Sequence, residues 1–312
     1  MNMPVLVTGG AGFIGGHLVL ALVEAGARVR VLDNFSSGSE TNLPTSGIEI
    51  MRGDIRNPSN CAQAVAGCTA VFHLAAMGSV PRSLEEPQLY NEVNITGTLN
   101  VLEAARSAGA KRVIYSASSS AYGDTLILPK IETMPPMPLS PYAITKLAGE
   151  YYCRIFAKLH NVETISLRYF NVFGPRQNPR SQYAAVIPAF LSALQENRPP
   201  KIYGNGEQTR DFCFVANVVK ANLLAATTPK KLCGEVVNIA CGQRISLNAM
   251  LAKMQAMLGT KITPEYLPPR PGDVRDSLAD ITAASALLGY HPEALFEEGL
   301  RQTVASYAQS RI

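Results

Sequence analysis

A glycine-rich turn directly after a short apolar segment constrains this sequence more than any other feature. Residues 4–7 are typical of a buried strand, and glycines follow at positions 9, 12 and 15. Glycine permits a tight turn and close approach of the backbone to a phosphate, and a helix beginning here would present unpaired N–H groups. Asp33 ends the next apolar segment, about 20 residues on, where a carboxylate accepts ribose hydroxyls and repels the extra phosphate of NADP. The pattern predicts an NAD site; the alternative is a plain connecting turn.

Strand and helix patterns alternate through the first half of the chain. Short apolar segments typical of strands occupy residues 4–8, 28–33, 48–51, 70–75, 112–116 and 163–170. Apolar positions at helical spacing lie between several of them, at residues 13–25, 90–108 and 142–159. Such alternation implies right-handed crossovers, and it predicts an α/β fold with a doubly wound parallel sheet of the Rossmann type.

The regular alternation stops after about residue 170. We predict a helix at 184–195, short strands at 201–203 and 236–240, and helices towards the end. These elements indicate a smaller C-terminal α+β lobe. We therefore expect an NAD-binding domain at 1–172, with return segments near 210–240, and a substrate lobe at 173–312, with the ligand between them.

Composition and charge exclude several classes of protein. The 28 basic and 24 acidic residues are spread evenly, which is unlike a nucleic-acid-binding surface. No apolar run approaches the roughly 20 residues that span a bilayer, and no secretion leader precedes the first strand. The six cysteines lack metal-ligand spacing. We expect a cytoplasmic protein with reduced thiols, no metal and no membrane or nucleic-acid partner.

Tyr142 and Lys146 form a candidate catalytic pair. They are four residues apart, so on a helix their side chains share one face. A phenol has a pKa near 10, and lowering it by roughly three units requires about 4 kcal/mol of preferential stabilisation of the phenolate. The Lys146 ammonium and the positive nicotinamide ring of NAD could supply this together. A surface pair with no catalytic role is the alternative.

Several motifs together resemble one known family. The G-x-x-G-x-x-G spacing and the segment YAITK at 142–146 are similar to the extended short-chain dehydrogenases/reductases, over nearly the whole chain. Within that branch the sequence resembles the UDP-glucose and UDP-N-acetylglucosamine 4-epimerases. The resemblance implies that Tyr142 takes the proton of the sugar 4-hydroxyl, to which Ser118 hydrogen-bonds, while hydride moves to NAD. The resulting 4-keto sugar turns over within the site and recovers the hydride on its other face.

The resemblance also implies which residues line the two halves of the site. Besides the three glycines and Asp33, Asp54 and Ile55 are weaker candidates for the adenine pocket. The remaining residues expected to contact the cofactor are Phe13, Ile14, Asn34, Ser36, Ser37, Gly38, Leu74, Ala75, Ala76, Asn94, Ser116, Tyr142, Lys146 and Tyr169. Those expected to contact the UDP-sugar are Ser118, Ser119, Ser120, Tyr142, Asn171, Ala185, Val186, Tyr203, Arg210, Arg270, Asp273 and Ser277. Arg210 and Arg270 match positions that clamp the diphosphate, and Asn171 would bond the diphosphate or the sugar.

Two positions narrow the expected reaction. Related dehydratases carry an Asp-Glu pair after the serine that matches Ser118, because eliminating water needs an added acid and base, whereas this chain has Ser119 and Ser120. In the epimerases a tyrosine at the position of Ser277 excludes an N-acetyl group, and a small residue admits it. We therefore predict UDP-N-acetylglucosamine 4-epimerisation, with UDP-glucose also admitted.

Other interpretations stay open. These are an epimerase restricted to UDP-glucose, a UDP-glucuronate 4-epimerase, and a non-catalytic NAD-binding regulator. Family resemblance further implies a homodimer, in which the helices at 90–108 and 142–159 form a four-helix bundle with their mates.

Overall fold

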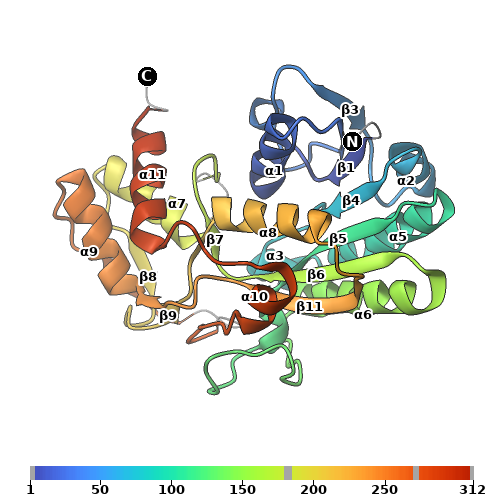
Figure 1. Cartoon of the computed structure of the whole chain (residues 1–312). Coiled ribbons are helices and arrows are strands. Elements are labelled where there is room, and N and C mark those ends of the chain that lie inside the picture. Colours follow the sequence, from blue (N-terminus) through green and yellow to red (C-terminus); the bar gives the residue numbers. More distant parts are fainter. Residues whose placement is uncertain (1–3, 179–184, 270–273, 310–312) are drawn as a thin grey trace.

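A seven-stranded parallel sheet forms the centre of the chain, in a computed structural model that describes residues 4–178, 185–269 and 274–309 (Figure 1). The strand order is β11-β6-β5-β4-β1-β2-β3, which confirms the predicted doubly wound sheet. Its strands are β1 (Val5–Thr8), β2 (Val29–Asp33), β3 (Ile48–Arg52), β4 (Ala70–His73), β5 (Arg112–Ser118), β6 (Glu163–Tyr169) and β11 (Cys233–Ile239).

Helices cover both faces of the sheet because successive strand residues point to opposite sides. Val5 and Val7 pack in one core cluster with residues of α1 (Phe13–Glu24) and α8 (Val215–Thr227). Leu6 belongs to the cluster on the other face. That second cluster takes its helical residues from α2 (Pro58–Val65), α5 (Gly97–Ser107) and α6 (Pro141–His160).

The helix expected at 90–108 is interrupted. Helix α4 (Pro87–Asn91) passes into a π-helical turn, η2 (Glu92–Thr96), before α5 begins. Such widened turns are frequent at functional sites, and no sequence signal marks this one. The short helix α3 (Val80–Glu85) precedes α4.

The C-terminal lobe packs around a cluster of aromatic side chains. Phe173 lies 6.0 Å from Phe212 and 5.6 Å from both Phe214 and Phe296, ring centre to ring centre. The lobe contains α7 (Val186–Gln195), α9 (Leu247–Leu258) and α11 (Phe296–Gln309), whereas α10 (Thr282–Leu288) packs beside β11 and α8 in the core of the main sheet. Its strands form short pairs: β7 (Val172–Phe173) with β10 (Cys213–Phe214), β8 (Lys201–Tyr203) with β13 (Glu265–Leu267), and β9 (Thr209–Arg210) with β12 (Ile245–Ser246).

The strand expected at 236–240 is the edge strand β11 of the main sheet, where it pairs in parallel with β6. It lies within the return segments expected near 210–240. Its apolar residues complete the core under α8. Among the described residues, no helix combines the length and apolar character needed to cross a membrane.

A buried ion pair joins β6 to α6. Arg168 donates to both carboxylate oxygens of Glu150 at 2.8 and 2.7 Å, and both side chains are at most 5% exposed. The guanidinium also lies 4.6 Å from the centre of the Tyr122 ring. The pair fixes the helix that carries Tyr142 against the central sheet.

Replacing one partner of this pair should destabilise the fold strongly. Glu150→Leu leaves the Arg168 guanidinium buried without its counter-charge, so we expect a loss of about 3–5 kcal/mol in the free energy of unfolding, measured with urea. The control is Glu103→Leu, which breaks a half-exposed pair with Arg106 and should cost about 1 kcal/mol or less. Equal losses for the two variants would contradict this assignment.

Candidate active site

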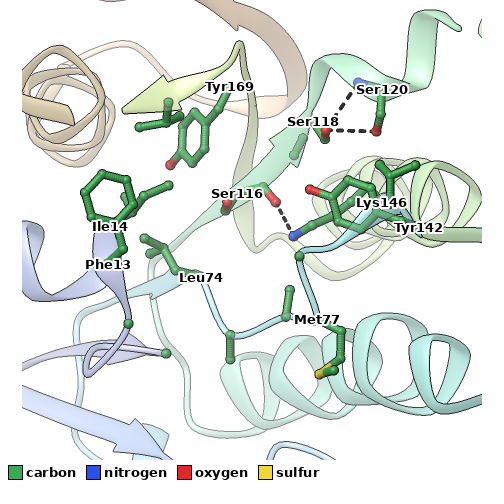
Figure 2. A pocket seen from close by; sticks show the side chains of 18 of the residues that line it. Phe13, Ile14, Leu74, Met77, Ser116, Ser118, Ser120, Tyr142, Lys146 and Tyr169 are labelled. Carbon is green, nitrogen blue, oxygen red and sulfur yellow. Dashed lines mark hydrogen bonds between the residues drawn. The ribbon is translucent and has the colours of Figure 1, made fainter. Parts of the chain in front are cut away.

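A cavity of about 630 Å³ lies where the sheet strands end and the C-terminal lobe begins. Residues at the carboxyl ends of β1, β2, β4, β5 and β6 line it. The C-terminal lobe contributes Ala185, Arg210, Val274 and Ser277. This is the crevice in which open α/β sheets bind ligands. Figure 2 shows part of its wall, with Tyr142 and Lys146 on one side and Phe13, Ile14 and Leu74 on the other.

The glycine turn fits a dinucleotide. Gly9 has a positive φ of +70°, and a Cβ there would lie 2.6 Å from the backbone nitrogen of Ala75. A Cβ on Gly15 would lie 2.1 Å from the carbonyl oxygen of Gly9. Helix α1 begins at Phe13 without a side-chain cap, so its first N–H groups remain for an anion.

Asp33 lies at the end of β2 on the cavity wall. Its Oδ2 accepts from Ala11 N at 2.9 Å and its Oδ1 from Phe35 N at 2.8 Å, so the glycine turn and the next turn both orient the carboxylate. Asp54 also lines the cavity and accepts from Asn34 Nδ2 at 2.9 Å. Hydrogen bonding from Arg56 lowers the pKa of Asp54 to about 2, which keeps that carboxylate ionised. Both carboxylates therefore line the cavity, and that of Asp33 is hydrogen-bonded to the glycine turn.

Tyr142 and Lys146 project from the first turns of α6. The Ser140 hydroxyl caps this helix by accepting from Ala143 N at 3.2 Å, and Pro141 occupies its first position. Lys146 Nζ donates to the carbonyl oxygen of Ser116, which lies near the end of β5; the distance is 2.7 Å (Figure 2). The cap and this bond fix both side chains relative to the sheet.

Burial shifts both groups towards their neutral forms. It lowers the pKa of Lys146 to about 8, and the interactions with Cys153 and Glu150 oppose the shift. Burial also raises the pKa of Tyr142, and a hydrogen bond with Ser118 opposes that shift. At neutral pH the lysine is therefore an ammonium and the phenol stays protonated. Ionising the phenol therefore requires a further positive charge, such as the nicotinamide ring of NAD.

Hydroxyl groups gather beside this pair. Ser118 ends β5 and is 8% exposed; its Oγ accepts from Ser120 N at 3.2 Å and from Ser120 Oγ at 2.8 Å. Ser119 and Ser120 follow in the short helix η3 (Ser119–Tyr122) and also line the cavity. The serine cluster therefore offers several donors and acceptors next to the Tyr142 phenol.

Asn171 and Ser277 face the cavity from the lobe side. The amide nitrogen of Asn171 donates to the Asp211 carbonyl oxygen at 3.0 Å and to Ser277 Oγ at 3.1 Å. Both of its hydrogens are thus engaged, and its oxygen can only accept. This favours a sugar hydroxyl over a diphosphate as the partner of Asn171. Arg210 also lines the cavity, and its Nη1 donates to the Arg275 carbonyl oxygen at 2.8 Å.

A few predicted residues lie away from this cavity. Asn94 is 1% exposed and bonds the backbone of Met77, Gly38 packs on the glycine turn, and Val186 begins α7. Tyr203 lines a neighbouring cavity of about 870 Å³ that shares Arg210. Arg270 and Asp273 are outside the described residues. All the other predicted residues line the main cavity: Gly9, Gly12, Phe13, Ile14, Gly15, Asp33, Asn34, Ser36, Ser37, Asp54, Ile55, Leu74, Ala75, Ala76, Ser116, Ser118, Ser119, Ser120, Tyr142, Lys146, Tyr169, Asn171, Ala185, Arg210 and Ser277.

Other residues line the cavity that were not expected from the sequence. Met77 and Gly78 continue the loop after β4 and could have been found from their neighbours at 74–76. Lys130 could not, because it lies in an irregular segment without a motif. It is 2% exposed and its amine donates to the Thr125 carbonyl oxygen. Burial lowers its pKa.

Comparison with known proteins points to one family. A family model described as the NAD dependent epimerase/dehydratase family matches residues 5–240. A putative UDP-glucose 4-epimerase from Methanocaldococcus jannaschii is 37% identical over 302 residues, covering 96% of this chain and 97% of that protein.

Solved structures agree over the whole length. A UDP-N-acetylglucosamine 4-epimerase from Methanobrevibacter ruminantium, in complex with UDP-N-acetylmuramic acid, has a TM-score of 0.94 at 40% identity and covers 99% of each chain. A UDP-glucuronic acid 4-epimerase from Bacillus cereus, bound to UDP-glucuronic acid and NAD, has a TM-score of 0.92 at 32% identity, covering 99% of this chain and 100% of that one.

Asp33 should set both the affinity and the choice of dinucleotide. Asp33→Asn removes the charge and turns an amide hydrogen towards one of the two backbone donors. We expect NAD binding, measured by calorimetry, to weaken by at least about tenfold, since hydrogen bonds to charged groups are worth roughly 1.5–3 kcal/mol. NADP should lose less than NAD. Asp280→Asn, a turn carboxylate that accepts from Thr282 N, is the matched control; unchanged NAD affinity in Asp33→Asn would count against this assignment.

Proposed function

This chain belongs to the NAD dependent epimerase/dehydratase family, and from that premise we propose that it is a UDP-sugar 4-epimerase whose principal substrates are UDP-N-acetylglucosamine and UDP-N-acetylgalactosamine. One observation carries the proposal. Tyr142, Lys146 and Ser118 lie on the wall of the same cavity as the glycine turn and Asp33, so a sugar and a dinucleotide can meet there.

The residues of this chain divide the work of the reaction. NAD, when bound, supplies a reversible hydride acceptor for the sugar carbon. Tyr142 accepts the proton of the 4-hydroxyl and later returns it, and Ser118 hydrogen-bonds the same oxygen. Lys146 holds a positive charge beside the phenol, which favours the phenolate. The transient 4-keto sugar regains both hydrogens with the opposite configuration, so the reaction has no net redox change.

The serines after Ser118 favour epimerisation over dehydration. Eliminating water requires a further acid and base near the sugar, and Ser119 and Ser120 supply hydroxyls instead of carboxyls. The absence of a carboxyl pair at these two positions therefore supports a reaction that leaves every hydroxyl in place.

Ser277 supports the acetylated sugars. Its small side chain lines the cavity and is held by hydrogen bonds from Asn171 Nδ2 at 3.1 Å and from Asp211 N at 3.3 Å. The volume beside it is available to an N-acetyl group, and one of the similar solved structures is named as an epimerase of UDP-N-acetylglucosamine.

UDP-glucuronate is the second candidate substrate. Lys130 lines the same cavity as the serine cluster, and its buried amine would attract a carboxylate on the sugar. A similar solved structure binds UDP-glucuronic acid. Measuring turnover of UDP-N-acetylglucosamine, UDP-N-acetylgalactosamine and UDP-glucuronate by the same enzyme distinguishes the two candidate functions.

We also propose a homodimer. Helix α6 exposes Ile144, Tyr151, Ile155 and Leu159, which recur at intervals of seven, four and four residues and so form one stripe along the helix. Such a stripe on an otherwise polar surface is typical of a helix that packs against a partner. A second copy of α6, with the neighbouring α5, would form the expected four-helix bundle.

Removing the Tyr142 hydroxyl should abolish turnover and leave the cofactor bound. We expect Tyr142→Phe to lower kcat by at least about 100-fold, the usual value of a positioned acid–base group, with NAD affinity nearly unchanged. Tyr90→Phe is the control. Its ring meets that of Tyr142 edge to face at 6.4 Å, and its hydroxyl accepts from Ser79 N. Normal turnover by Tyr142→Phe would refute the assigned base.

Substrate choice should respond to the volume at position 277. Ser277→Tyr fills the space beside the sugar, so we expect turnover of UDP-N-acetylglucosamine to fall by at least about tenfold relative to UDP-glucose. Ser277→Ala keeps the volume and should retain activity on both. Wild-type enzyme that leaves acetylated sugars unchanged, or equal losses on both sugars in Ser277→Tyr, would contradict the proposed specificity.

A further inference from the structure

A fully buried histidine connects two elements of the active site without lining the cavity. His73 ends β4 and is 1% exposed. Its Nδ1 lies 2.7 Å from Thr8 Oγ1, at the end of β1, and its Nε2 lies 2.9 Å from Thr98 Oγ1, on α5. Both ring nitrogens therefore have partners, one in the sheet and one in a helix.

The neighbouring bonds determine which nitrogen carries the proton. Thr98 Oγ1 donates to the Asn94 carbonyl oxygen at 2.6 Å, so it must accept from an Nε2–H of His73. The other nitrogen, Nδ1, then accepts from the Thr8 hydroxyl. Thr8 Oγ1 in turn accepts from Ala75 N at 3.2 Å. Only one placement of the protons gives every donor in this series of hydrogen bonds an acceptor, and in that placement the imidazole is neutral.

The same series of hydrogen bonds reaches α6, the helix that carries Tyr142. Asn94 lies in the π-helical turn, and its amide nitrogen donates to Thr145 Oγ1 at 3.0 Å; Thr145 donates to the Tyr142 carbonyl oxygen at 2.9 Å. Asn94 also bonds Met77 in both directions, accepting from its N–H at 2.8 Å and donating to its carbonyl oxygen at 3.1 Å. The loop after β4 and the backbone at Tyr142 are thus connected through one side chain.

We propose that His73 is a positioning residue of the reaction, which links Thr8 to Thr98 and so holds the cofactor-facing loops at a fixed distance from Tyr142. The inference rests on the proposed function. The loops concerned are Gly9 after β1 and Ala75 to Met77 after β4, and all of these residues line the cavity. Hydride and proton must leave neighbouring atoms of one sugar, so a small error in this distance lowers turnover.

The imidazole keeps this arrangement across the working pH range. Burial, and secondly the charge of Lys146, lower the pKa of His73 to about 3. The Tyr115 ring lies close to both groups, 5.7 Å from the His73 ring and 5.1 Å from Lys146 Nζ. A protonated ring would lose its acceptor for Thr8 and repel the ammonium that Tyr142 needs.

Two amide variants separate the two ends of the link. Asn places its amide about where Nδ1 lies and can still accept from Thr8, whereas Gln reaches about as far as Nε2 and can still donate to Thr98. We expect His73→Asn to keep NAD affinity and lose at least about tenfold in kcat. His73→Gln should instead weaken NAD binding by about fivefold, the effect of one lost hydrogen bond on the glycine turn.

A merely structural histidine predicts a different pattern. Both variants would then lose thermal stability while the folded holoenzyme kept wild-type kcat and NAD affinity, and that result would overturn the proposal. If neither variant folds, two variants of the next residue test the same series of hydrogen bonds. Thr98→Val removes the hydroxyl that bonds His73, and Thr98→Ser keeps it. A kcat loss in Thr98→Val that Thr98→Ser restores supports the link; equal kcat in these two variants overturns it.

The proposed function can fail separately. NAD affinity is measured by calorimetry without any sugar, so the His73→Gln result stands whatever the substrate. Wild-type enzyme that turns over no UDP-sugar would refute the proposed function, and the NAD affinities of His73→Gln and His73→Asn would still decide the link between His73 and Thr8.

Discussion

The parallel register of the central strands determines where every polar group of the site lies. Thr8 pairs with His73 across β1 and β4, His73 pairs with Tyr115 across β4 and β5, and Ser118 pairs with Tyr169 across β5 and β6. Strands β1 and β4 end at paired residues, whereas β5 and β6 continue three residues beyond the end of β4, and residues at or directly after these ends line one cavity. A shift of a single residue in any pair would turn these side chains to the opposite face of the sheet.

The charges around Tyr142 follow from the same arrangement. The sheet and α6 bury Lys146 deeply enough to lower its pKa to about 8, yet leave it protonated at neutral pH. Burial raises the pKa of the Tyr142 phenol, so the protein alone does not ionise it. Under the proposed mechanism, Tyr142 therefore ionises only when a cationic ring lies beside it.

Much of the fold and part of the site follow from local sequence signals. The glycine turn, Asp33 and the pair at 142 and 146 have fixed spacing, because each is set by one turn or one helix. The sequence indicates only a return to the first domain near 210–240 and not which strand β11 joins, because its partner lies about 70 positions earlier and short-range patterns carry no pairing information. The π-helical turn at Asn94 and the burial of Lys130 depend on contacts that form only when the elements pack together, so no local sequence pattern predicts them.

The return of the chain to the sheet at β11 has a consequence for biosynthesis. Strand β6 has β11 as its outer neighbour, and Tyr169 at its end accepts a hydrogen bond from Asn222 of α8 at 2.8 Å. The apolar flank of β6 lacks its covering helix until the ribosome has released the chain past residue 227, and it lacks its covering strand until the chain is released past residue 239. A nascent Rossmann half therefore presents an unpaired strand edge, the kind of surface that recruits chaperones or aggregates. The two lobes of this protein must mature together, and neither is expected to be a separable module.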